Sequence, residues 1–453
     1  MDPLTEVARW YRGQKRGSAS TSDEAFSVSA DTRLHRILRL DETKAFLKER
    51  LAEIRRTDGS EIGSLRAALY TELLDPIDPR LLPYLRVHSA SCELHKAAYE
   101  RVKFNLDMAQ RLAAFETPSE PVAMTAVPVV DVRDLPVEYA MEKRPVVLKG
   151  GAALVMPADK MWTLASLQTH PTASLKRVPT KRYIADSVRW ARLEEGPVLA
   201  LGDFVESLPS SNLYLHDHSV PLHFPDLIQD VSIPSYFAAD FLQRMPEGSL
   251  YRETWPSLFV GPRGSASQLH IDSFGSNFWM ALLQGRKHWV LVDPDDMHLL
   301  RPQLNPGLHD VVFEAELRLP ADSTDVFQFA RRQECILEAG DILFVPSGTP
   351  HYVGNLTDTV ALSANYIDES NWKEAVAALE RQATTDPRAR DVARHIVNCV
   401  NDSLAKQSPG ASIPFAEFKR PAAAVCSVTP LPAVKRAKLD AEFLADWSDS
   451  DND

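Results

Sequence analysis

The sequence has few of the features that mark secreted, zinc-binding or membrane proteins. It holds four cysteines in 453 residues, and none of them belongs to a CxxC pair. Such scattered cysteines indicate neither a disulfide framework nor a zinc knuckle, and they favour a reducing compartment inside the cell. No apolar signal segment follows the N-terminal Met-Asp-Pro-Leu, and no stretch approaches the ~18 uninterrupted apolar residues of a membrane helix. We therefore expect no membrane partner.

An excess of positive charge is also absent. The formal net charge is −12, so the molecule as a whole is not an electrostatic binder of nucleic acids or anionic membranes. Hydrophobic residues make up 44% of the chain and charged residues 25%, which is typical of soluble globular proteins. The chain is too long for one ordinary core, and its length predicts about three domain-sized units.

The N-terminal part of the chain divides into a polar segment and a helical one. Residues 1–39 open with a stretch rich in Ser, Thr and Ala, and we predict that they are disordered. Apolar residues recur at helical spacing in Lys44–Arg56 and in Cys92–Phe115, which predicts a helical region over residues 40–116. This region shows no catalytic motif, so a scaffold or partner-binding role is expected for it. A loop rich in Pro and Ser then marks a domain boundary.

Short β-prone runs separated by Pro, Gly, Asn and Asp fill residues 124–368. This succession favours a barrel or a sandwich. Helical patterns return in residues 369–407, where Trp372–Glu380 and Arg388–Leu404 are separated by Asp-Pro. The remaining residues, 408–453, are dominated by Pro, Ala and Ser and are predicted to form a disordered tail.

Two histidines and one aspartate in the β-rich region have the pattern of a metal site. His270 and Asp272 stand two residues apart, so both side chains would point to the same side of a strand. His351 follows a Ser-Gly-Thr-Pro turn that feeds a new strand, and an antiparallel barrel can bring the two strands together. Two histidines and one carboxylate form the facial triad that holds Fe(II) and leaves positions open for a co-substrate and O₂. The ordinary alternatives are a chance HxD sequence and a turn histidine.

Lys287 is the residue that best supports this interpretation. It follows Gln284-Gly285-Arg286, and this strand–Gly–strand pattern predicts that it lies on the strand after the one that carries Asp272. A lysine that points into a barrel is costly unless an anion meets it. A dicarboxylate that chelates iron at one end would supply that anion at the other. The ordinary alternative is a solvated lysine beside a hairpin turn.

Three motifs in this order resemble the JmjC-domain Fe(II)/2-oxoglutarate oxygenases, in their cupin-like hydroxylase branch. They are Ser265–Asp272, Trp279–Trp289 and Gly340–His351, and the resemblance extends over roughly residues 144–368. It is greatest to the branch with lysyl hydroxylase and arginine demethylase activities. It implies a mainly β core, a double-stranded β-helix of the JmjC/cupin jelly-roll type, with N-terminal and C-terminal α-helical segments.

The resemblance also implies roles for individual residues and names the cofactors as Fe(II), 2-oxoglutarate and O₂. His270, Asp272 and His351 match the iron ligands, and Lys287 matches the lysine that pairs with the distal carboxylate of 2-oxoglutarate. Met280 departs from the pattern, because the relatives have an inward Asn there. The other residues that match the co-substrate pocket are Ser267, Tyr214, Ser363 and Asn365.

The expected activity is a dioxygenase that hydroxylates a protein side chain, in a histone or another nuclear protein. The first alternative is demethylation of N-methyl-lysine or N-methyl-arginine, and the second is a catalytically silent JmjC scaffold. A metal isomerase or binding protein that does not use 2-oxoglutarate is a further option, against which Lys287 argues. The absence of a Cys/His-rich chromatin-reader finger weighs against a dedicated histone demethylase.

A basic segment in the tail bears on location. Pro432–Asp440, with the core Lys-Arg-Ala-Lys, resembles a monopartite nuclear localisation signal. It predicts a nuclear import receptor as a partner and the nucleus as the location, with the cytoplasm as a second compartment. The C-terminal helices are candidates for forming a homodimer.

Overall fold

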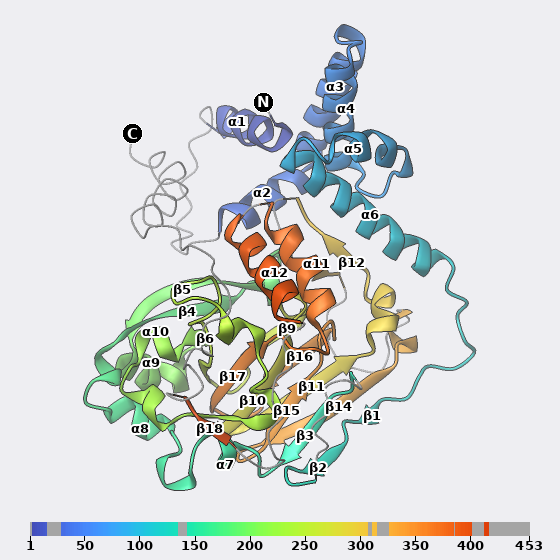
Figure 1. Ribbon diagram of the computed structural model, residues 1–453. Helices are drawn as coiled ribbons and strands as arrows, with labels where there is room; N and C mark the ends of the chain where they lie inside the picture. Colours follow the sequence, from blue (N-terminus) through green and yellow to red (C-terminus); the bar gives the residue numbers. More distant parts are fainter. Residues whose placement is uncertain are drawn as a thin grey trace.

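Two facing β-sheets form the centre of the protein (Figure 1). The computed structural model describes residues 2–15, 29–134, 143–306, 310–314, 326–384, 386–400 and 412–415. The seven-stranded sheet has the order β2 (Val129–Asp131), β3 (Val146–Lys149), β15 (Ile342–Val345), β10 (Asn277–Gln284), β17 (Thr359–Tyr366), β8 (Ser257–Gly261), β6 (Leu215–Ser219). The five-stranded sheet has the order β1 (Thr125–Ala126), β14 (Arg332–Glu338), β11 (Arg286–Val292), β16 (His351–Asn355), β9 (Ala266–His270).

The chain passes back and forth between the sheets. Strands β8 and β10 belong to the seven-stranded sheet, whereas β9 and β11 belong to the five-stranded one. The same alternation holds from β14 to β17, and neighbouring strands within these stretches are antiparallel. This alternation is the connectivity of a jelly roll. The predicted fold class, a double-stranded β-helix with helical segments at both ends, is confirmed.

This connectivity corrects the predicted position of Lys287. The residue lies on β11, and β10 intervenes between β11 and the segment that carries Asp272. Gly285 makes the crossing from one sheet to the other with φ +90°, a conformation that glycine adopts without strain. A Cβ atom at Gly285 would lie 2.3 Å from the carbonyl oxygen of Asp358, so a larger residue does not fit there. Gly285 does form a turn between two strands, as the strand–Gly–strand pattern predicts, but the turn links the two sheets and does not form a hairpin.

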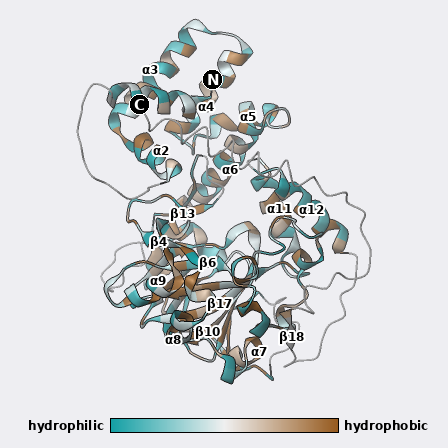
Figure 2. Cartoon of the chain, turned by 90° about the vertical axis from the view of Figure 1, so that its left-hand side faces the viewer, coloured by the Kyte–Doolittle hydropathy of each residue, from teal (hydrophilic) through white to brown (hydrophobic). Residues whose placement is uncertain are grey.

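Alternating side chains of the seven-stranded sheet enter two separate hydrophobic layers. In β10, Phe278, Met280 and Leu282 face the five-stranded sheet, whereas Trp279, Ala281 and Leu283 face the opposite layer. That outer layer is shared with helices α7 (Ala152–Val155), α8 (Leu164–Thr169), α9 (Leu201–Ser207), α11 (Trp372–Gln382) and α12 (Arg388–Cys399). Figure 2 shows hydrophobic residues gathered between these layers, around β10 and β17. The C-terminal helices therefore bury their apolar faces, including Leu379 and Ile396, within the same chain.

The N-terminal helices gather at one end of the molecule (Figures 1 and 2). They are α1 (Pro3–Lys15), α2 (Ala30–Arg39), α3 (Asp41–Thr57), α4 (Glu61–Leu74), α5 (Leu82–His88) and α6 (Glu93–Ala113). Helix α6 joins them to the core, because Asn105 both donates to and accepts from the backbone of Leu304 in β12 (Pro302–Leu304). Arg101 donates to the same Leu304 carbonyl and pairs with Glu72.

The prediction of disorder over residues 1–39 is wrong for the residues described there. Helix α1 packs the buried Val7 against Leu47 and Tyr70, and its Glu6 forms a 2.6 Å ion pair with Arg50. Helix α2 begins at a Ser29 cap. Helices this short are marginal in isolation and take most of their stability from tertiary packing. Their polar composition concealed apolar residues at helical spacing, such as Leu34, Ile37 and Leu38 of α2, which pack against the same cluster.

The C-terminal prediction is also corrected at one place. Within residues 408–453, which were predicted to be disordered, β18 (Ser412–Pro414) pairs with β7 (Ser232–Pro234). The basic segment 432–440 lies outside the described residues. In the part of the chain that the structure describes, no helix combines the length and the apolar composition needed to cross a membrane.

Candidate metal centre

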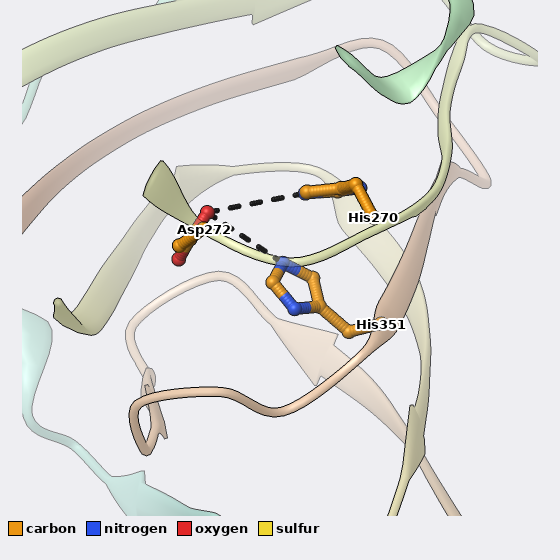
Figure 3. Close-up of side chains that lie close together, drawn as sticks. All are labelled: His270, Asp272 and His351. Carbon is orange, nitrogen blue, oxygen red and sulfur yellow. Dashed lines mark ion pairs between the residues drawn. The ribbon is translucent and has the colours of Figure 1, made fainter. Parts of the chain in front are cut away.

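The three predicted metal ligands meet at one end of the five-stranded sheet. His270 is the last residue of β9, His351 is the first of β16, and the two face each other in the antiparallel register. Asp272 lies just beyond the end of β9, in an extended conformation. Its Oδ1 is 4.0 Å from the Nε2 atom of each histidine, as the dashed lines in Figure 3 show. The possible ligand atoms of all three residues lie within 4.8 Å of one another.

Backbone carbonyls fix the orientation of both imidazoles. The Nδ1 atom of His270 is 2.5 Å from the carbonyl oxygen of Gln268, and the Nδ1 atom of His351 is 2.9 Å from that of Thr349. Each Nδ1–H donates to its carbonyl, which leaves the Nε2 lone pair directed toward Asp272. Burial lowers the pKa of His351 to about 4 and places that of His270 well below its ordinary value. Both rings are therefore neutral at pH 7, the state in which histidine binds a metal.

Asp272 has the properties expected of a metal ligand. Burial, and secondarily the negative charge of Asp217, raises the pKa of Asp272 to about 7. Its Oδ2 atom is buried and has no hydrogen-bond partner among the described residues. A bound divalent cation would supply the missing partner and keep the carboxylate ionised. Two nitrogen ligands, one oxygen ligand and no thiolate form a donor set that suits Fe(II), so the residues present fit the expected metal.

Lys287 is a fully buried cation whose described partners are neutral. Its side chain is 0% exposed, and its Nζ atom donates to Asn355 Oδ1 at 2.7 Å and to the Tyr214 hydroxyl at 3.3 Å. Among the described residues, no carboxylate pairs with it. Burial lowers the pKa of Lys287 to about 7. A buried ammonium group without a counter-anion is costly, and a bound anion would remove that cost.

The other predicted pocket residues do not all reach the cleft beside the metal ligands. Tyr214, Ser267 and Asn365 line this cleft. Ser363 and Lys287 are both fully buried outside its lining, but Lys287 bonds to Tyr214, which lines the cleft, whereas the Ser363 hydroxyl has no hydrogen-bond partner among the described residues. Met280, directly opposite Ser363 in the sheet, does line the cleft and gives it an apolar surface there.

Several residues near the site were not found from the sequence. Asn355 pairs with Lys287 across the sheet, and its position four residues after His351, on the same side of a strand, was a usable signal. Trp190, His216 and Asp217 also line the cleft; His216 lies two residues after the predicted Tyr214, which was a usable signal, whereas Trp190 comes from a distant segment without a motif. Asp217 has a φ of +53° at an irregularity in the β6–β8 pairing. Strained residues of this kind often occur at functional sites.

Comparison with known families agrees with this fold and site. The family model described as "Cupin-like domain" matches residues 133–371, which is more than half of the chain. The protein therefore belongs to the cupin-like domain family. The matched region contains His270, Asp272, His351 and Lys287.

Curated relatives are oxygenases and demethylases. The chain is 32% identical to the human 2-oxoglutarate and iron-dependent oxygenase JMJD4 over 174 residues, which is 36% of this chain and 39% of the relative. It is 30% identical to the arginine-specific demethylase JMJ22 of Arabidopsis thaliana over 178 residues, 37% of this chain and 34% of the relative. The lysine-specific demethylase JMJ21 of the same plant is 28% identical over 240 residues, 51% of this chain and 24% of the relative. The chain thus spans between a quarter and two fifths of the length of these relatives.

Proposed function

We propose that this protein is an Fe(II)- and 2-oxoglutarate-dependent dioxygenase. The observation that carries the proposal is the pairing of two features in one β core. One is a 2-His-1-carboxylate cluster in which the Nε2 atoms of two neutral imidazoles converge with the carboxylate. The other is Lys287, a buried cation with only neutral described partners. An isomerase or a metal-binding cupin has no need of the second feature. The names of the relatives point to the same cofactors.

Each residue has a distinct part in the proposed reaction. His270, Asp272 and His351 would hold the iron, and Lys287 with Tyr214 would bind the distal carboxylate of 2-oxoglutarate through charge-assisted hydrogen bonds. When bound, iron with 2-oxoglutarate and O₂ supplies the oxidising power to convert a C–H bond into C–OH, while 2-oxoglutarate becomes succinate and CO₂. The protein orients these groups and excludes water. Trp289 and Phe278, which line the cleft next to His351, provide part of that apolar enclosure.

The cleft favours a cationic side chain as the substrate. Asp217 lines it together with Trp190, Trp255 and Phe259, and a carboxylate among aromatic faces attracts an ammonium or guanidinium group. We therefore propose a lysine or arginine side chain of a protein as the group that is hydroxylated. Demethylation of an N-methyl group on the same side chains remains the second candidate, because hydroxylation of that methyl releases formaldehyde. The arginine- and lysine-specific names of two relatives favour keeping it.

The location and the macromolecular partners of the protein are part of this proposal. The basic segment 432–440 supports nuclear import by an import receptor, and hence a histone or another nuclear protein as substrate. For a homodimer through the C-terminal helices, a surface other than the buried faces of α11 and α12 is required, because those faces already pack on the core.

A turnover assay with Fe(II), 2-oxoglutarate and lysine- or arginine-containing peptide libraries tests the proposal. Succinate formation would be followed by NMR and the peptides by mass spectrometry. We expect a gain of about 16 Da for hydroxylation, whereas a loss of about 14 Da identifies demethylation. Asp217→Asn should reduce kcat/KM for the cationic peptide roughly tenfold and change peptide-independent succinate formation much less. Absence of succinate with every peptide would favour the silent scaffold.

A further inference from the structure

Trp190 contacts the metal-binding segment in two ways. Its indole ring meets the His270 imidazole edge to face, with ring centroids 4.2 Å apart. Its Nε1–H donates to the backbone carbonyl of Ile271 at 2.8 Å. Ile271 is the residue between His270 and Asp272, and β9 ends just before it. The indole thus holds the backbone at the point where the chain leaves the sheet and must still present two ligands to one ion.

The loop that carries Trp190 is not held by its own conformational preferences. It connects β4 (Arg177–Tyr183) with β5 (Leu193–Ala200). Ala191 and Arg192 have φ values of +51° and +56°, which side-chain-bearing residues adopt only when surrounding contacts enforce them. Within the loop, the backbone N–H of Ile184 donates to the carbonyl of Arg192 at 3.0 Å. The Arg192 backbone N–H donates to the Arg189 carbonyl at 3.0 Å and its guanidinium to the Ala185 carbonyl at 2.8 Å, and contacts from outside the hairpin add to these bonds.

Helix α2 supplies contacts on both sides of Trp190. Before it in the chain, Arg189 forms a 2.6 Å ion pair with Asp31. After it, Glu194 accepts hydrogen bonds from the backbone N–H of Ser29 at 3.0 Å and from the Thr32 hydroxyl. Glu194 is only 3% exposed, and these bonds, together with one from the Ser187 hydroxyl of the same loop at 2.6 Å, make its burial tolerable. A helix near the N-terminus therefore anchors the loop that forms one wall of the metal site.

We propose that Trp190 is a positioning residue for the His270–Asp272 segment, and that helix α2 holds Trp190 in that position. The N-terminal helical region then sets how well the metal ligands are preorganised, even though it contributes no ligand itself. The inference rests on the proposed metal centre. Outer contacts that orient metal ligands typically change metal affinity by ~10–100-fold when they are removed.

Metal binding without turnover provides the test. Mn²⁺ affinity of the full-length protein would be measured by EPR in the absence of 2-oxoglutarate, together with hydrogen exchange of peptides covering residues 266–276. Trp190→Phe keeps an aromatic ring but removes the N–H donor, and Thr32→Val removes the hydroxyl on Glu194. Thr43→Val on α3 is the matched control for the latter. Thr43 is equally buried, but its hydroxyl has no partner among the described residues.

We expect Trp190→Phe and Thr32→Val to weaken Mn²⁺ binding, by roughly tenfold for Trp190→Phe and less for Thr32→Val, and to speed exchange around residue 271. Thr43→Val should resemble the wild type. Wild-type affinity and exchange in Trp190→Phe would overturn the positioning role. If Thr32→Val does not fold, the exposed pair is tested with Asp31→Asn, and wild-type behaviour there overturns the role of α2. Wild-type Mn²⁺ binding by His270→Ala would instead overturn the metal centre itself.

Discussion

The two sheets of the core contribute differently to the site. The five-stranded sheet carries Lys287 and the two histidine ligands, with Asp272 directly after it. Strand β14 of this sheet leaves every residue except Leu337 partly or fully exposed. The seven-stranded sheet is different, because β8, β15 and nearly all of β10 and β17 are buried on both faces. It supplies mainly apolar walls, such as Phe278 and Met280.

The five-stranded sheet thus carries the groups for the chemistry, and the seven-stranded sheet supplies most of the stability. A sheet packed on both faces tolerates few polar side chains, so it is suited to be a rigid support. The other sheet carries groups that are costly when no ligand is bound, namely the Lys287 ammonium and the imidazoles beside the Asp272 carboxylate. Functional sites commonly violate the rules of stable packing in this way, and the rest of the fold compensates. Substitutions of the site residues on the five-stranded sheet should accordingly lower activity and keep stability, whereas substitutions in the seven-stranded sheet should lower stability.

The largest effect is expected from the ligands. His270→Ala or Asp272→Ala should reduce succinate formation to background, because two remaining ligands do not hold the iron on one face. Thermal unfolding without added metal should change little or shift upward, since each change removes a buried polar group. Succinate formation above background in either variant would contradict the assignment. Lys48→Met, at an exposed site on α3, is the control and should keep wild-type activity and stability.

Substitution of Lys287 should weaken ligand binding and at the same time raise stability. Lys287→Met should weaken 2-oxoglutarate binding by at least ~100-fold, because a charge-assisted contact in a buried pocket is lost. The same change should stabilise the ligand-free protein near pH 7–8, because the buried ammonium no longer has to be neutralised or desolvated. Calorimetric titration with 2-oxoglutarate and urea unfolding measure the two effects. Tighter 2-oxoglutarate binding or a loss of stability would contradict this role.

The pH dependence of that stability has a definite sign. The pKa of Lys287 is lowered to about 7 in the folded protein, whereas an unfolded lysine titrates near 10.4. Between these values the unfolded state binds more protons, so this group makes stability rise with pH from about 7 to about 10. The full effect is on the order of 4 kcal/mol. Urea unfolding across this range should show a flatter profile for Lys287→Met than for the wild type.

The supporting sheet is tested by truncating apolar side chains. Leu362→Ala in β17, at a position with 0% exposure, should cost about 2–5 kcal/mol of unfolding free energy because a cavity remains. Ile336→Ala in β14, where the side chain is 46% exposed, should cost less than about 1 kcal/mol. Urea unfolding of both variants makes the comparison. Equal losses would mean that the two sheets do not differ in the way proposed.

The smallest effect is expected at Ser363. Its hydroxyl is buried on the seven-stranded sheet without a described partner and outside the cleft lining. Ser363→Ala should leave the KM for 2-oxoglutarate within about twofold of the wild type and keep or slightly raise stability, since a buried unsatisfied hydroxyl is costly. Ser267→Ala, in the cleft, should raise that KM more. A large KM increase for Ser363→Ala would restore the co-substrate role that the resemblance suggested.

The metal ligands and Lys287 could be predicted from the sequence because short-range patterns mark them. His270 and Asp272 are two residues apart, and a strand places such residues on one side. The turn before His351 and the glycine before Lys287 mark where strands begin. Residues that no local pattern links were missed. Trp190 and Asp217 reach the cleft from a hairpin loop and from an irregular strand pairing, and only long-range packing brings them there.

The sequence by itself determined the donor set, the order of the strands that carry it and the class of chemistry, because ligand types and strand periodicity are properties of short segments. The tertiary structure alone decided which sheet each strand joins, so that β10 lies in the opposite sheet and β16 lies between the strands of His270 and Lys287. It also decided that α1 and α2 fold, since their stability comes from contacts with residues far away in the chain. Glu194 shows the reason most directly. Its partners Ser29 and Thr32 lie more than 160 residues before it, at a separation where no local pattern can signal a contact.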